Sequence, residues 1–213
     1  MNQSQSDAFE SELRKSFLRF GIELLTEAQI NRLVKHYKLL CKWNERFNLT
    51  RITEPREAAI LNYAESFFGA KFIAQAKTML DIGSGAGFPA IPIAIAQPEL
   101  DVTALEVNQK KSLFLTEVKF ELSLANFRVI TARLEDIDCS NYDLLTCRAL
   151  DRAETTLPSI ISDLTEGQHL MIYCVQDLVD KLASQFPVGF KVEVNQIPES
   201  EGRLIAIFSR DRA

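Results

Sequence analysis

The feature that most constrains this chain is a set of glycines directly after a run of apolar residues. Residues 78–82, Thr-Met-Leu-Asp-Ile, have the composition of a buried strand, and Gly83, Gly85 and Gly87 follow before a helix predicted from Pro89. Glycine adopts positive φ and lets a bound group approach the backbone closely. The sequence therefore predicts an α/β unit that binds a ligand at the carboxyl end of its first strand.

An acidic residue stands where such a site needs one. We predict the next strand over residues 101–107, and Glu106, near its end, follows Gly83 by 23 positions. In nucleotide-binding α/β folds, an acid about 20 residues after the loop accepts hydrogen bonds from ribose hydroxyls. Loop, strand and acid together favour a ligand that contains adenosine, the alternative being a purely structural glycine turn.

Asp81 distinguishes between two adenosine cofactors. A carboxylate just before the glycines is unfavourable beside a pyrophosphate, whereas it attracts the ammonium and sulfonium groups of S-adenosylmethionine. The spacing G-x-G-x-G also differs from the dinucleotide fingerprint G-x-G-x-x-G. We therefore expect S-adenosylmethionine, with an NAD oxidoreductase as the weaker alternative. The sequence holds no Ser–His–Asp or Asp/Glu–His arrangement that indicates hydrolysis.

The remainder of the chain predicts the fold class. Further strands are expected at 127–131, 142–147 and 169–175, with helices at 110–122, 153–163 and 177–185. Two last strands, 190–197 and 203–209, have no helix between them and are expected to pair antiparallel. This alternation predicts an α/β fold with a doubly wound, mostly parallel seven-stranded sheet and an N-terminal helical extension. We expect the helical subdomain at 1–72 and the cofactor-binding domain at 73–213.

Positive charge is concentrated near the N-terminus. The chain has 24 basic and 29 acidic residues, a net charge of −5, which argues against a general nucleic-acid coat protein. Residues 29–56 nevertheless contain seven basic residues and two acidic ones. On a helix predicted over 27–47, Lys35, Lys38, Lys42 and Arg46 lie opposite the apolar side. This face is either simply solvated or a docking surface for an anionic partner.

Several other classes are disfavoured. We find no apolar run near the roughly 20 residues needed to span a bilayer and no N-terminal segment resembling a signal peptide. The four cysteines form no CxxC pair, and the two histidines do not complete a zinc site with them at the usual spacing. We expect a cytoplasmic protein with reduced cysteines and no metal site.

Several motifs resemble a known family. They are Lys42-Trp-Asn-Glu-Arg-Phe-Asn-Leu-Thr50, Leu80-Asp-Ile-Gly-Ser-Gly-Ala-Gly-Phe-Pro-Ala-Ile-Pro92, Lys110-Lys111 with Phe114-Leu115, Arg133-Leu-Glu135 and Cys147-Arg-Ala149. Over about residues 24–208 the sequence resembles the glucose-inhibited division protein B family, also called RsmG. These proteins are class I, S-adenosylmethionine-dependent methyltransferases that act on guanine N7 in 16S ribosomal RNA.

The resemblance implies roles for individual residues. Gly83 and Phe88 would line the methionine and ribose side of the cofactor, Leu134 and Glu135 would border the adenine, and Arg148 would reach the cofactor or an RNA phosphate. Together with the loop analysis, this predicts a cofactor site formed by Asp81, Gly83, Gly85, Gly87, Phe88, Glu106, Leu134, Glu135 and Arg148. The expected partner is 16S rRNA or the small ribosomal subunit, bound by a monomer through Lys35, Lys38, Lys42, Arg46, Arg51 and Arg56. No general base is assigned, because N7 already carries an in-plane lone pair.

Five positions depart from the family pattern. Asn62 and Glu65 occupy a motif usually read as His-x-x-Asp-Ser, Ala90 stands where glycine is usual, and Cys174-Val175 replaces a common Lys-Gly. The cofactor side therefore matches the family better than the substrate side. Two alternatives remain: a methyltransferase of a protein or small molecule, and a non-catalytic RNA-binding or ribosome assembly factor.

Overall fold

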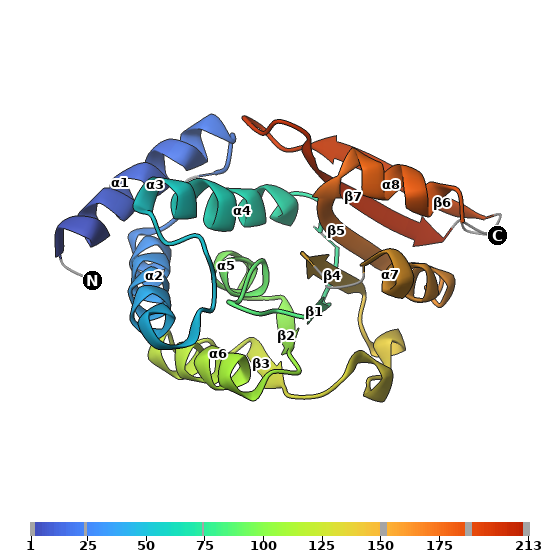
Figure 1. Cartoon of the computed structure of the whole chain (residues 1–213), viewed down its shortest axis with the longest axis horizontal. Helices are drawn as coiled ribbons and strands as arrows, with labels where there is room; N and C mark the ends of the chain where they lie inside the picture. The colour runs from blue at the N-terminus through green and yellow to red at the C-terminus, as the bar shows by residue number, and fades with distance from the viewer. Residues whose placement is uncertain (1–2, 24, 74, 150–152, 186–188, 211–213) are drawn as a thin grey trace.

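The computed structural model describes residues 3–23, 25–73, 75–149, 153–185 and 189–210. These residues contain a seven-stranded sheet in the order β3-β2-β1-β4-β5-β7-β6. Strands β1 to β5 are parallel, and β7 is antiparallel to both β5 and β6. The strands are β1 Thr78–Ile82, β2 Asp101–Leu105, β3 Phe127–Ile130, β4 Leu144–Arg148, β5 His169–Val175, β6 Phe190–Gln196 and β7 Arg203–Arg210. The predicted fold class is confirmed, including the antiparallel pair at the edge (Figure 1).

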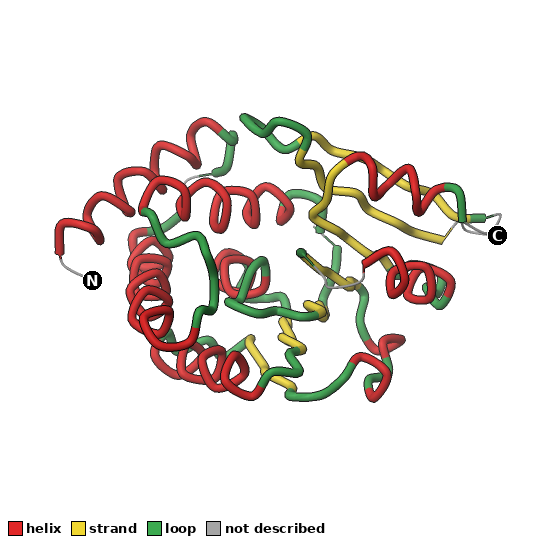
Figure 2. The backbone as a smooth tube through the Cα atoms, viewed as in Figure 1, coloured by secondary structure: helices red, strands yellow, loops and turns green. Residues whose placement is uncertain are grey.

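Helices cover both faces of this sheet (Figure 2). The α-helices are α1 Gln3–Arg19, α2 Glu27–Phe47, α3 Pro55–Glu57, α4 Glu65–Ala70, α5 Ala90–Ala96, α6 Gln109–Glu121, α7 Ala153–Ser162 and α8 Gln176–Ala183. A π-helical segment, η1 Ala58–Ala64, joins α3 to α4, and two short 3₁₀ turns, η2 Leu134–Asp136 and η3 Cys139–Asn141, lie between β3 and β4.

Alternation along the strands divides the interior into two cores. Met79 and Val102 point to the face covered by α1 to α6, whereas Leu80 and Leu145 point to the face covered by α7 and α8. Successive side chains of a strand point to opposite faces, so strands buried on both faces need apolar residues at nearly every position. This explains why the central strands read as continuous apolar runs.

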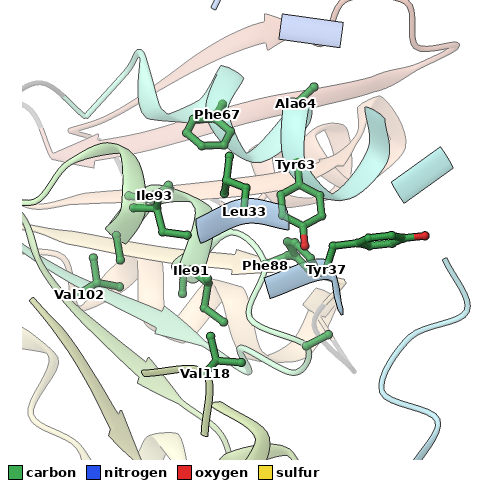
Figure 3. Packing of buried hydrophobic residues seen from close by; sticks show 14 of the residues in the cluster. Leu33, Tyr37, Tyr63, Ala64, Phe67, Phe88, Ile91, Ile93, Val102 and Val118 are labelled. Carbon is green, nitrogen blue, oxygen red and sulfur yellow. The ribbon is translucent and has the colours of Figure 1, made fainter. Parts of the chain in front are cut away.

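The N-terminal helices pack onto the first of these cores. Helix α2 begins at a capping box in which Thr26 and Gln29 satisfy each other's backbone N–H groups. Its apolar side buries Leu33 and Tyr37, and the Phe9 ring of α1 stacks on Tyr37 with ring centroids 4.0 Å apart. Figure 3 shows Leu33 and Tyr37 in the same cluster as sheet-side residues such as Val102. The helical residues and the sheet therefore share one core, and the boundary between 72 and 73 stays a prediction.

Some predicted boundaries shift. The helical segment that follows α2 is a composite of α3, η1 and α4 and ends at Ala70. The second strand ends at Leu105, so Glu106 is the first residue beyond it. Strand β4 begins at Leu144 rather than at residue 142. The carboxylate of Asp143, just before it, accepts hydrogen bonds from the backbone N–H groups of Lys77 and Thr78.

Candidate cofactor site

The glycine loop lies at the carboxyl end of β1 and is tied to the end of β2. Gly83, Gly85 and Gly87 all adopt positive φ, at 72°, 57° and 88°. The N–H groups of Gly83 and Ser84 both donate to the Leu105 carbonyl, at 2.8 and 3.0 Å. A Cβ at position 87 would lie 2.2 Å from Cδ1 of Ile91, so glycine is needed there for space as well as for conformation. The loop geometry is thus fixed without any bound group.

Asp81 brings an unsatisfied negative group to this loop. Its side chain is almost completely buried, and Oδ1 accepts a hydrogen bond from the Thr146 hydroxyl at 2.8 Å. Oδ2 has no hydrogen-bond partner among the described residues. Burial raises the pKa of Asp81 to about 7. A buried carboxylate oxygen without a donor is suited to a cationic group of a ligand, as the sequence predicts for the ammonium of S-adenosylmethionine.

Glu106 connects the loop to helix α6. Its Oε2 accepts from the Gly85 N–H and its Oε1 accepts from the Asn108 N–H, both at 2.8 Å. The Asn108 side chain in turn caps α6 by accepting from the N–H groups of Lys110 and Lys111. Each carboxylate oxygen has a second lone pair, so Glu106 retains capacity to accept from ribose hydroxyls.

Leu134 and Glu135 lie on η2, beyond the end of β3. They line one side of a cavity of about 560 Å³ whose opposite side includes Thr155 and Ser159 of α7. Because β3, β2, β1 and β4 are neighbours in the sheet, η2 leaves the same edge as the glycine loop. This position suits the adenine end of a cofactor, and the individual adenine contacts stay a prediction.

Phe88 directly follows the glycine loop, and its side chain packs into the apolar core. Its ring is buried and packs edge-on against Tyr63, with ring centroids 5.1 Å apart (Figure 3). The His36 ring lies 5.3 Å from it between centroids. His36 Nδ1 and the Tyr63 hydroxyl are hydrogen-bonded at 2.9 Å. The ring of Phe88 is thus part of the hydrophobic core, directly after the glycine loop. A contact between Phe88 and the cofactor stays a prediction.

Arg148 lies at the end of β4 in an ion-pair cluster that sequence reasoning missed. Glu65 of α4, fully buried, accepts from Arg148 at 3.2 Å and from Arg203 of β7 at 2.8 Å. Burial raises the pKa of Glu65 and lowers that of Arg148, while each charge opposes the shift of the other. Nη1 of Arg148 is buried and has no partner among the described residues. The missed signal was the pair of arginines at two strand ends facing an acid within an otherwise apolar helix.

A second cavity, of about 400 Å³, adjoins this cluster. Arg148 and Glu65 line it together with Tyr173, and apolar side chains such as Leu157 and Leu178 complete it. Arg148 lies over the Tyr173 ring, 5.8 Å from the ring centre. Positions that depart from the family pattern are also here: Glu65 forms the ion pairs, and Cys174 and Val175 line the cavity. The other two departures lie elsewhere: Asn62 donates to the Ile52 carbonyl, and Ala90 is buried at the start of α5.

The predicted RNA-binding residues form one main group. Lys35, Lys38, Lys42 and Arg46 are exposed along α2, and Arg51 is exposed on the following loop. Lys35 is ion-paired with Glu121 at the end of α6, at 2.8 Å, which neutralises part of its charge. Arg56 lies on α3 and, with Lys15 and Arg19, lines a hollow beside α1. The structure thus brings the α2 residues together and separates Arg56 from them.

Among the described residues, no group of three or more His, Cys, Asp or Glu side chains is placed to hold a metal ion. In the same part of the chain, none of the helices is both long and apolar enough to cross a bilayer.

Comparison with known proteins identifies the family. The family model described as GidB, rRNA small subunit methyltransferase G, matches residues 29–196. The chain belongs to this family. The curated relatives named ribosomal RNA small subunit methyltransferase G include those of Stutzerimonas stutzeri, 38% identical over 70% of each chain, and of Neisseria meningitidis serogroup C, 37% identical over 64% of this chain and 66% of the relative. That of Chromobacterium violaceum is 39% identical over 65% of this chain and 66% of its own. The alignments thus span about two thirds of these relatives' length. The assignment to the GidB family rests on the matched residues 29–196.

Solved structures support the fold of this GidB family member. A ribosomal protein L11 methylase from Lactobacillus delbrueckii subsp. bulgaricus superposes with a TM-score of 0.57 at 15% identity, covering 72% of this chain and 80% of the other. A putative methyltransferase from Streptococcus mutans, in complex with SAH, gives a TM-score of 0.53 at 15% identity over 67% and 95% of the two chains. At this level of identity the likeness establishes the methyltransferase fold alone.

The buried carboxyl of Asp81 leads to a prediction about stability. Its pKa is about 7 in the folded chain and 3.8 when unperturbed. Between these values the folded state binds a proton that the unfolded state does not, so this group lowers stability as pH rises toward 7 and its full penalty is present above pH 7. Asp81→Asn removes the charge, and we expect it to stabilise the ligand-free protein by about 2–3 kcal/mol more at pH 8 than at pH 5. Urea unfolding at both pH values measures this difference, and an effect independent of pH would contradict it.

Proposed function

We propose that this protein is an S-adenosylmethionine-dependent methyltransferase that transfers a methyl group to N7 of a guanine in 16S rRNA. Family membership and the fold support the enzyme class. The observation that supports the cofactor assignment is the loop between β1 and α5. Asp81, just before this loop, has one carboxylate oxygen without a hydrogen-bond partner among the described residues, and Glu106, just after β2, accepts from the Gly85 N–H of the loop. We further propose that the enzyme is a cytoplasmic monomer.

The chain's residues would act mainly by positioning. When bound, S-adenosylmethionine supplies an electrophilic methyl group. Asp81 would hold its ammonium group, Glu106 its ribose, and Leu134 with Glu135 its adenine. Guanine N7 needs no proton removed before attack, so the site requires alignment rather than a general base, and alignment alone can supply about 7–11 kcal/mol. Positive charge moves toward the purine during transfer, and a nearby carboxylate such as Asp81 would stabilise it.

We place the target base in the cavity beside Arg148. N7 of a paired guanine lies in the deep, narrow major groove of an RNA helix, where side chains cannot reach it, so the base must be unpaired or flipped out. The cavity lies at the carboxyl ends of β4 and β5, and its volume of about 400 Å³ is ample for one purine. Cys147, which lines it, pairs in the sheet with Ile82, the residue just before the glycine loop. Its walls are largely apolar, with the Tyr173 ring on one side.

The central experiment tests the reaction itself. Gly83 is exposed to solvent and has a positive φ of 72°. Gly83→Asp therefore strains the backbone and adds a second negative charge near Asp81. We expect this variant to lose on the order of 100-fold in cofactor affinity, about 2.7 kcal/mol, and all measurable transfer. Calorimetry with S-adenosylmethionine measures binding. Mapping of N7-methylguanine in rRNA from cells with and without the gene measures the product, and identical maps would refute the proposal.

A charge-reversal experiment separates an RNA substrate from a small molecule or protein substrate. Lys38→Glu with Lys42→Glu should weaken binding of small-subunit RNA by on the order of 10- to 100-fold and reduce its salt dependence, because phosphate contacts release counterions. Cofactor affinity should not change. Lys77→Glu, at the opposite end of the strands, is the matched control and should leave RNA binding intact. Unchanged RNA affinity in the double variant would favour a different substrate.

Filling the cavity tests the placement of the base. Leu178→Trp puts a large ring into the space between α8 and Arg148, and we expect kcat/KM for rRNA to fall about 10-fold or more while cofactor affinity is retained. Val194→Trp, at an exposed position of β6, controls for the general effect of an added tryptophan. Equal kcat/KM values for the two variants would show that the base binds elsewhere.

A further inference from the structure

A phenyl ring is exposed at the end of helix α2. Phe47 is the last residue of α2 and is 38% exposed. Asn48 follows in the left-handed conformation, and the Asn44 side chain accepts a hydrogen bond from the Thr50 N–H at 2.9 Å, so the chain turns back along the helix. Leu49 enters the core in this turn, and the ring of Phe47 remains on the surface.

The ring is supported from below by other aromatic side chains. Trp43, one helical turn earlier, lies 5.2 Å from Phe47 between ring centroids and packs edge-on against the buried ring of Phe114, 5.7 Å away. The three rings form one contiguous aromatic group from the core beside α6 to the surface at Phe47, with tilted and edge-on contacts. Such support holds the exposed ring in a fixed orientation, which is what a stacking surface for a flat ligand requires.

Positive charge surrounds this ring. Nζ of Lys110 lies over the face of the Phe47 ring, 5.5 Å from its centre, so this flexible side chain must swing aside when a base stacks there. Lys111 follows it in the first turn of α6. Arg46 precedes Phe47, and Lys42 lies one turn back along α2. An exposed aromatic ring among basic side chains is the arrangement by which proteins hold single-stranded nucleic acid, with bases on the ring and phosphates on the cations.

The location links this surface to the cofactor site. Asn108, which caps the helix carrying Lys110, is held by Glu106, whose other oxygen holds Gly85 of the glycine loop. We propose that Phe47 is a stacking platform for an unpaired base adjoining the target guanine. The neighbouring phosphates are held by four basic side chains, Lys42, Arg46, Lys110 and Lys111. This inference rests on the proposed function, in which rRNA is the substrate. Helix α2 thereby contributes a base contact as well as a basic face.

The chain contains its own reporter for this contact. Trp43 is its single tryptophan and lies against Phe47, so a base that stacks on the platform changes its fluorescence. The full-length protein is titrated with a purine-rich single-stranded RNA hexamer and with an abasic hexamer of equal charge. We expect the hexamer with bases to quench Trp43 and the abasic hexamer to bind more weakly without quenching.

Variants test the platform directly. Phe47→Ala should weaken hexamer binding about 5- to 100-fold, the range expected for loss of one stacked base, and should raise KM for rRNA with little change in kcat. Phe47→Tyr keeps the ring and should bind like the unmodified protein. Phe120→Ala is the matched control, because Phe120 is a 73% exposed phenyl on α6 that belongs to neither the aromatic group of Phe47, Trp43 and Phe114 nor the basic group. Calorimetry with S-adenosylmethionine should give equal affinities for all of these variants.

The outcomes separate this inference from the proposed function. Equal hexamer affinity for Phe47→Ala and Phe120→Ala, with methylation of rRNA intact, would overturn the platform and leave the proposed function standing. Quenching of Trp43 by a ribosomal protein peptide and not by RNA would also overturn it. Failure of the unmodified protein to methylate rRNA, despite cofactor binding, would instead contradict the proposed function.

Discussion

The turn between β1 and α5 is the constraint on which the site depends. Its backbone donates twice to the last carbonyl of β2 and once to Glu106, so the carboxyl ends of two neighbouring strands are locked together. These bonds require positive φ at successive glycines, which other residues adopt only with strain. Because Glu106 also accepts from the N–H of Asn108, which caps α6, the same network sets where helix α6 begins. The proposed cofactor site and the lysines proposed to hold RNA on α6 are therefore connected by one set of hydrogen bonds.

Helix α2 joins the two halves of the proposed function. One side carries the exposed lysines, and the other carries His36, which is fully buried beside Phe88. Burial lowers the pKa of His36 to about 3, so the ring stays neutral and accepts from or donates to the Tyr63 hydroxyl without an unpaired charge. The residue following the glycine loop thus packs directly on the helix that is proposed to meet RNA.

The two buried carboxylates near the site, Asp81 beside the glycine loop and Glu65 beside the Arg148 cavity, differ in how they are paired. Asp81 lacks a partner for one oxygen, whereas Glu65 is shared between Arg148 and Arg203. An unpaired buried carboxylate costs stability and is accepted where a ligand supplies the missing cation. The paired carboxylate of Glu65 stabilises the structure instead. Glu65 stands where the family motif usually has Asp, and its longer side chain reaches both Arg148 and Arg203. The departure from the family pattern at position 65 is therefore compatible with an intact site.

The sequence by itself determined the strand–helix alternation, the antiparallel edge, the capping box of α2 and the residues of the glycine loop, because each depends on local preference, periodicity or short-range hydrogen bonding. It also placed Asp81 and Glu106 at the same edge of the sheet, since neighbouring parallel strands end at a common edge. Only the tertiary structure decided what meets across large separations in the chain. It joined Glu65 to Arg203, turned the ring of Phe88 into the core, neutralised Lys35 with Glu121 and left Phe47 exposed on its aromatic support. These contacts depend on how the helices pack against the sheet, which local sequence patterns do not predict.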